Sequence, residues 1–150
     1  MNKNDKEVVD MTDNKINFIG KTGAGKTALI NALKQSTLLN DKNLVEIPIE
    51  SLNDKEGINQ KIRNINKKDD TILLIPAKDQ IDNKETLSLI DILKDASNKV
   101  VLAFTKIDEL DKNEIEIKQE VVQKNFTPFV SVAFIDSVHK SLEDFMKNFE

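Results

Sequence analysis

Three of the chain's four glycines lie in one eight-residue stretch, GKTGAGKT, which runs from Gly20 to Thr27. Its spacing is Gly-x-x-x-x-Gly-Lys-Thr, and it lies between a short apolar run and a segment with helical periodicity. Glycines allow such a loop to turn tightly and to wrap a phosphate chain with backbone N–H groups. Lys26 would then reach the outer phosphates, and the Thr27 hydroxyl would ligate Mg²⁺. The predicted phosphate site comprises Gly20, Lys21, Thr22, Gly23, Ala24, Gly25, Lys26 and Thr27.

A second polar group, Thr105-Lys106-Ile107-Asp108, directly follows another apolar run. A carboxylate at Asp108 can accept both N–H groups on one edge of guanine, whereas adenine presents no such donor pair there. The aliphatic stem of Lys106 could cover the plane of the base. An ordinary charged strand exit can contain the same residues. The order of the two motifs along the chain favours a guanine site over that alternative.

Apolar runs alternate with segments of helical periodicity, which indicates alternating strands and helices. Pro48 suggests that one strand lies at a sheet edge, where it could run antiparallel to the others. On the fourth helix, Ile117 and Val121 are predicted to face the core. We expect strands at 15–20, 43–49, 71–75, 99–104 and 127–134, and helices at 27–35, 57–65, 83–97, 113–125 and 138–149.

Strands that are apolar on both faces are typical of a parallel sheet covered by helices. We therefore predict an α/β fold of three layers, α/β/α, with a mostly parallel sheet and ligands bound beyond the carboxyl ends of the strands. The 150 residues suffice for one domain, which we place at 15–150 after a polar leader at 1–14.

Composition excludes several classes of function. The net charge of −4 and the pI near 5.2 give no electrostatic case for binding nucleic acid or an anionic membrane. The absence of cysteine excludes disulfides and thiolate chemistry. No apolar run approaches the roughly 20 residues of a membrane span, and the first residues lack the apolar core of a signal peptide. We expect a cytoplasmic protein.

The two motifs, in this order, resemble those of P-loop GTPases of the translation-factor-related class, which includes the Era-like group. GKTGAGKT is similar to their first motif, and TKID is similar to their fourth, which usually begins with Asn rather than Thr105. The resemblance covers 15–150 and implies a P-loop G domain. It places a fifth motif at Ser131–Ala133, where the backbone N–H of Val132 would contact guanine.

The third motif of this class, Asp-x-x-Gly, has one candidate, Asp54 to Gly57. The resemblance implies that Asp54 holds Mg²⁺, but DKEG can also be read as a surface turn. Ile58 follows, where signalling GTPases often carry a glutamine that orients the attacking water. Because isoleucine cannot orient water, we expect slow hydrolysis unless a partner, a dimer or an ion supplies the missing group. Arg63 is expected to be a solvated helix residue.

The resemblance implies a Mg²⁺-dependent protein that binds GTP and GDP and hydrolyses GTP slowly, with Lys26, Thr27 and Asp54 serving catalysis. Two alternatives stay open: a binding module with degenerate switches and no turnover, and a P-loop ATPase or kinase. The wording of the two motifs is similar to small GTPase-like proteins of the ethanolamine and propanediol utilisation type. That narrower likeness implies a bacterial microcompartment as the setting, and a protein effector or a second copy of the chain as partner.

Overall fold

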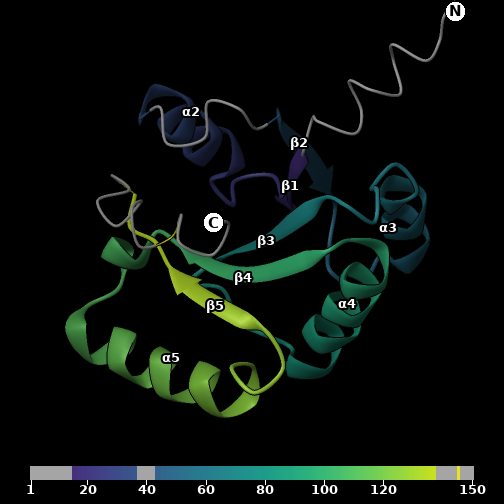
Figure 1. Cartoon of the computed structure of the whole chain (residues 1–150). Helices are drawn as coiled ribbons and strands as arrows, with labels where there is room; N and C mark the ends of the chain where they lie inside the picture. The colour runs from purple at the N-terminus through teal and green to yellow at the C-terminus, as the bar shows by residue number, and fades with distance from the viewer. Residues whose placement is uncertain (1–14, 37–42, 138–144, 146–150) are drawn as a thin grey trace, which may run out of the picture.

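The computed structural model describes residues 15–36, 43–137 and 145, and its strands and helices alternate along the chain (Figure 1). The elements are β1 (Lys15–Lys21), α2 (Lys26–Ser36), β2 (Asn43–Ile49), α3 (Lys55–Ile62), β3 (Asp70–Pro76), α4 (Asn83–Ala96), β4 (Lys99–Thr105), the 3₁₀ helix η1 (Ile107–Glu109), α5 (Lys112–Asn125) and β5 (Ser131–Phe134). The predicted α/β class is confirmed. Among the described residues, no helix is long and apolar enough to cross a membrane.

The five strands form one sheet in the order β2-β1-β3-β4-β5, and every neighbouring pair is parallel. β2 lies at an edge, as Pro48 indicated, but the suggestion that it runs antiparallel is wrong. It pairs with β1 in parallel from Lys15 opposite Asn43 to Lys21 opposite Ile49. A helical crossover through α2 separates the two strands in sequence, and such a connection suits parallel neighbours.

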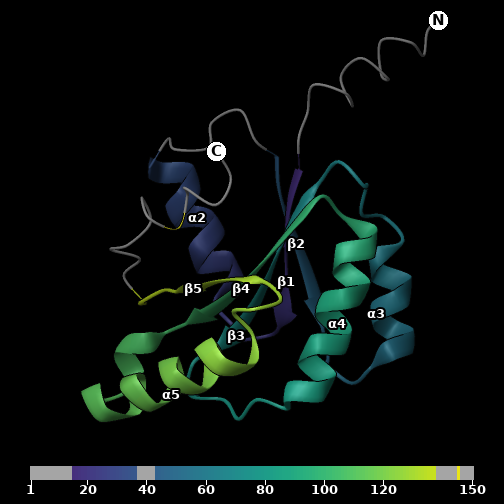
Figure 2. The same ribbon diagram turned by 60° about the horizontal axis from the view of Figure 1, so that its bottom comes forward.

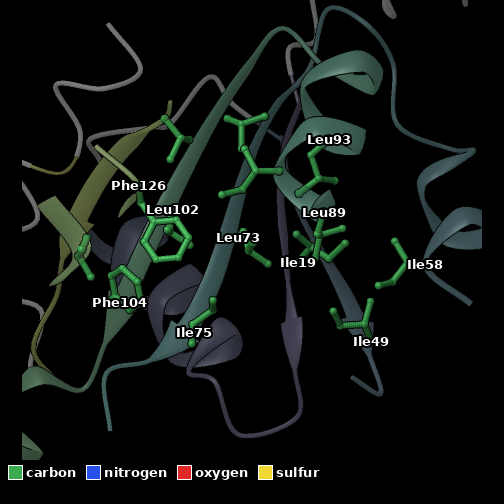
Figure 3. Packing of buried hydrophobic residues seen from close by; sticks show 14 of the residues in the cluster. Ile19, Ile49, Ile58, Leu73, Ile75, Leu89, Leu93, Leu102, Phe104 and Phe126 are labelled. Atoms are coloured by element: carbon green, nitrogen blue, oxygen red, sulfur yellow. The ribbon is translucent and has the colours of Figure 1, made fainter. Parts of the chain in front are cut away.

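Helices cover both faces of the sheet, which gives the predicted three layers (Figures 1 and 2). α2 packs on one face through Leu29, Ile30 and Leu33, and Phe145 joins the same apolar cluster. Phe145 is the described part of the helix predicted at 138–149. On the opposite face, side chains of α3, α4 and α5 meet the strands in a second cluster, with Ile58, Leu89 and Leu93 visible in Figure 3.

The buried face of α5 differs from the predicted one. Ile117 and Val121 are 55% and 40% exposed, whereas Val122 and Phe126 are buried. The inward face also includes Lys118, whose stem is half-buried and whose Nζ donates to the carbonyl of Asp79 at 2.8 Å. Burial lowers the pKa of Lys118. A sequence pattern counts lysine as polar even where its aliphatic stem faces inward. The predicted inward face of α5 was therefore displaced by one residue from the observed one.

The last strand is shorter than predicted, beginning at Ser131 rather than at Thr127. A turn follows α5, in which the N–H of Val130 donates to the carbonyl of Phe126 at 3.0 Å. β5 then pairs with β4 from Ser131 opposite Val101 to Phe134 opposite Phe104. This register decides which residues of the segment can reach the carboxyl end of the sheet.

Candidate functional site

The glycine-rich loop joins β1 to α2 at the carboxyl edge of the sheet. From β1 the chain passes to β2 on one side and then to β3 on the other, so the loop begins where the strand order reverses. Crevices at such points are the usual ligand sites of parallel α/β sheets. Gly23 and Gly25 have φ angles of 88° and 95°, which side-chain-bearing residues rarely adopt. The loop conformation therefore requires glycine at both positions.

The loop leads directly into the N-terminus of α2. The N–H of Leu29 makes the first intrahelical bond, to the carbonyl of Gly25 at 3.0 Å. The N–H groups of 26–28 precede it and have no acceptor within the helix. Such groups, with the positive end of the helix dipole, favour an anion at this position. Ala24 differs from the expected arrangement, because its N–H donates to the carbonyl of Lys21 within the loop.

The Lys26 side chain curls back over its own loop and is only 3% exposed. Its Nζ donates to the carbonyls of Gly20 at 2.8 Å and Lys21 at 2.7 Å. Burial lowers the pKa of Lys26, while the nearby Glu46 carboxylate acts in the opposite direction. An ammonium has three donors, so two hold the side chain to the loop and a third can serve a phosphate.

Two residues of the TKID motif fasten the end of β4 to this loop. The buried Thr105 hydroxyl donates to the carbonyl of Ala24 at 2.7 Å, and Lys106 Nζ donates to the carbonyl of Gly23 at 2.7 Å. Lys106 has a φ of 58°, a left-handed conformation that is uncommon for residues with a side chain. The sequence analysis associated both residues with guanine. In the structure their side chains contact the glycine-rich loop and hold it in position.

Asp108 lies exposed in η1, one turn beyond the end of β4. Its Oδ1 accepts a hydrogen bond from the backbone N–H of Ser137 at 2.6 Å. The chain after β5 also joins this end of the sheet, because Ile107 donates to the carbonyl of Ile135 at 3.2 Å. The carboxylate is thus held at the carboxyl edge, on the side where the TKID turn contacts the phosphate loop.

The structure does not bring Ser131 and Val132 to Asp108. They pair with Val101 and Leu102, whereas β4 ends later, at Thr105. A residue at the start of a strand cannot reach the carboxyl edge, so the placement of the fifth motif needs correction. Ser137, which the sequence analysis did not single out, is the residue whose N–H contacts Asp108. Its signal is a second serine followed by an apolar residue, beyond the end of the strand rather than within it.

The two expected metal residues, Thr27 and Asp54, have separate hydrogen-bond partners. The exposed Thr27 hydroxyl donates to Oε1 of Glu46 on β2 at 2.8 Å. Asp54 is instead the N-cap of α3, where its carboxylate accepts the N–H of Gly57 at 3.2 Å. Sequence reasoning missed Glu46, because a single acidic residue within an edge strand belongs to no motif.

The residue after the Asp54–Gly57 segment, Ile58, is a core residue. Ile58 is 2% exposed and packs in the core between α3 and the sheet. Arg63 is exposed at the C-cap of α3, as expected of a solvated helix residue. Ile58 therefore offers no polar group that could orient water.

The oxygen-bearing side chains beside the glycine-rich loop suit a metal ion that binds together with a phosphate ligand. Within 15–36, 43–137 and 145, no group of three or more His, Asp or Glu side chains could hold a metal ion. The Thr27 hydroxyl is a hard oxygen donor, and the adjacent Glu46 carboxylate accepts its hydrogen. Mg²⁺ is typically bound by one or two such groups together with substrate phosphates. These residues therefore fit Mg²⁺ bound with a phosphate chain.

Solved structures of other proteins share the fold of this chain. No protein-family model and no curated protein sequence matches the chain. Among solved structures it is similar to translation elongation factor SelB from Methanococcus maripaludis in its apo form, with a TM-score of 0.62 and 17% identity over 91% of this chain. It is also similar to the bacterial selenocysteine-specific elongation factor EF-Sec, with a TM-score of 0.60 and 17% identity over 92% of the chain.

A third similar structure is an ADP-ribosylation-factor-like GTP-binding protein, the small COPII coat GTPase SAR1 from Encephalitozoon cuniculi, in complex with GDP. Its TM-score is 0.52, with 14% identity over 82% of this chain and 68% of that one. This chain has the fold of a GTPase G domain. It spans about a third of the two elongation factors, 32% and 28% of their lengths, so the likeness concerns their G-domain fold alone.

Proposed function

We propose that the chain is a guanine-nucleotide-binding protein that takes GDP and GTP with Mg²⁺. The observation that carries this proposal is the fastening of the TKID turn to the glycine-rich loop by Thr105 and Lys106. These two hydrogen bonds fix a phosphate cradle and an exposed carboxylate, Asp108, relative to one another. A nucleotide needs both features at a set separation, whereas a surface turn needs neither.

Each part of the nucleotide has a proposed contact. The N–H groups at the start of α2 and the Lys26 ammonium would bind the phosphates. Thr27 would ligate Mg²⁺, which neutralises phosphate charge when it is bound. Asp108 would accept the two N–H donors of guanine, and the N–H of Ser137 adjoins that carboxylate. The earlier assignment of Mg²⁺ to Asp54 would require its carboxylate to serve both the metal and the N–H of Gly57.

Hydrolysis is proposed to be slow. Ile58 is apolar and buried, so it cannot orient water. An effector protein or a second copy of the chain could supply the missing polar group. The second candidate function, a nucleotide-binding module without turnover, is favoured by the role of Asp54 as a helix cap. An ATPase or kinase remains the least supported alternative, because Asp108 suits guanine and Arg63 is the only arginine available to clamp a second phosphate.

The narrower likeness to ethanolamine and propanediol utilisation proteins rests on the wording of the two motifs. We keep the associated microcompartment setting as a hypothesis within this proposal. Copurification with shell proteins from a cell that forms such compartments would test it. A chain recovered entirely in the absence of shell proteins would contradict it.

Equilibrium titration with GDP, GTP, ADP and ATP tests the proposed function. Two hydrogen bonds to a charged acceptor contribute about 1.5–3 kcal/mol each, so guanine nucleotides should bind roughly 100-fold or more tightly than adenine nucleotides. Asp111→Asn is a matched control, since it removes a nearby carboxylate charge while leaving an N-cap acceptor for α5. Equal affinity for GDP and ADP would contradict the proposal.

A further inference from the structure

Glu46 and Thr27 meet from two different elements. Glu46 lies in the middle of β2 and is paired with Phe18 of β1, so the two side chains share one face of the sheet. Phe18 packs in the cluster beneath α2. Thr27 is the second residue of that helix, and its hydroxyl donates to Glu46 Oε1 at 2.8 Å. The sheet register therefore delivers a carboxylate to the first turn of the phosphate-loop helix.

The two acids considered for this site have different partners. Glu46 accepts a hydrogen bond from the Thr27 hydroxyl at 2.8 Å. The side chain of Asp54 caps α3, where its carboxylate accepts the N–H of Gly57. Among the described residues, Glu46 is thus the acid with a direct hydrogen bond to the Thr27 hydroxyl.

We propose that Glu46 is the positioning residue for Mg²⁺, orienting the Thr27 hydroxyl toward a metal–nucleotide complex. This inference rests on the proposed function. A hydroxyl has one hydrogen and two lone pairs, so donating the hydrogen to Glu46 leaves the lone pairs for a cation. A carboxylate that accepts this hydrogen also makes the ligating oxygen more basic. Glu46 would act through Thr27 and would not itself contact the reacting atoms.

Without Mg²⁺, the negative charge of Glu46 should weaken nucleotide binding rather than strengthen it. A carboxylate near the phosphate loop repels phosphates, while a divalent cation between them converts this repulsion into attraction. The affinity of the wild-type chain for GDP should therefore rise when Mg²⁺ is added. Removing the charge should leave the affinity in EDTA equal or tighter and should remove most of the gain from Mg²⁺.

The test measures the dissociation constant of fluorescent GDP in EDTA and in excess Mg²⁺. Glu46→Gln should lose about 10- to 100-fold of the Mg²⁺-dependent gain. Asp54→Asn should keep the gain, because asparagine also caps helices. Glu56→Gln, an exposed carboxylate in the first turn of α3, is the charge control and should match wild type. Thermal unfolding without nucleotide checks that all the variants fold.

The outcomes separate this inference from the proposed function. If Mg²⁺ raises the GDP affinity of Glu46→Gln as much as that of wild type, the inference is overturned. The same holds if Glu46→Gln binds GDP more tightly than wild type by the same factor in EDTA and in Mg²⁺. Loss of the gain in Asp54→Asn alone would assign the metal to Asp54 instead. If wild type binds GDP with no Mg²⁺ gain, the nucleotide site stands and the inference falls. If wild type binds GDP in neither condition, the proposed function falls, and the inference with it.

Discussion

Replacing Thr105 with valine removes the hydroxyl that joins β4 to the phosphate loop while nearly keeping the side chain's shape. Thr105 is 1% exposed, and its hydroxyl donates to the carbonyl of Ala24 at 2.7 Å. The substitution deletes this donor and leaves a buried carbonyl with one bond fewer. We expect the free energy of unfolding to fall by about 1–3 kcal/mol, measured without nucleotide.

The same substitution at Thr71 is a matched control. Thr71 is fully buried in β3, and its hydroxyl has no hydrogen-bond partner among the described residues. Thr71→Val therefore removes a polar group whose burial is uncompensated, and it should leave stability unchanged or raise it by about 1 kcal/mol. The two variants make an identical chemical change in neighbouring strands, so their difference isolates the bond to Ala24.

Urea unfolding of both variants measures this difference, and GDP titration then reports its consequence for the site. Thr105→Val should also weaken GDP binding, because the loop loses a fixed attachment, while Thr71→Val should bind GDP as wild type does. Equal stabilities of the two variants would refute the argument that the Thr105 bond holds the loop. Wild-type GDP affinity in Thr105→Val would show that the attachment does not position the site.

Three further predictions follow from the same structure. Lys26→Met keeps an apolar stem but removes the ammonium, so GTP affinity should fall by about 1.5–3 kcal/mol, and an unchanged affinity in a folded variant would make the loop a structural turn. On α5, Ile117→Glu should change the free energy of unfolding by less than about 0.5 kcal/mol, while Val122→Ala should lower it by about 1–3 kcal/mol. If urea unfolding shows the larger loss for Ile117→Glu, the assignment of Val122 to the buried face of α5 is wrong. Phosphate release from GTP should be well below the typical enzyme median of about 10 per second, because Ile58 is buried, and fast turnover by the isolated chain would refute this.

The strands were predictable because burial on both faces leaves continuous apolar runs in the sequence. The direction of the edge strand β2 was not predictable, because Pro48 indicates an edge without indicating whether the strand pairs in parallel or antiparallel. The inward face of α5 was misassigned because Lys118 occupies an inward position with its stem. Sequence periodicity counts such a residue as polar, although Lys118 is half-buried and its Nζ lies 6.0 Å from the centre of the Phe104 ring.

The site was predictable where chemistry demands a fixed local spacing. The phosphate loop and the TKID motif each lie within a few consecutive residues. The Thr27–Glu46 contact joins residues far apart in sequence, and it depends on the β1–β2 register. Ser137 was missed because two serine-containing segments follow α5, and only the register with β4 shows which one lies beyond the sheet.

Nucleotide selectivity of Asp108→Asn tests the central claim most directly. An aspartate accepts the two N–H donors of guanine, whereas an asparagine amide complements the N–H and C=O of xanthine. Asparagine also keeps an oxygen that can accept the Ser137 N–H. Competition of GDP and XDP for both proteins should show that wild type prefers GDP and that the variant prefers XDP. Identical preferences in the two proteins would contradict the placement of guanine at Asp108.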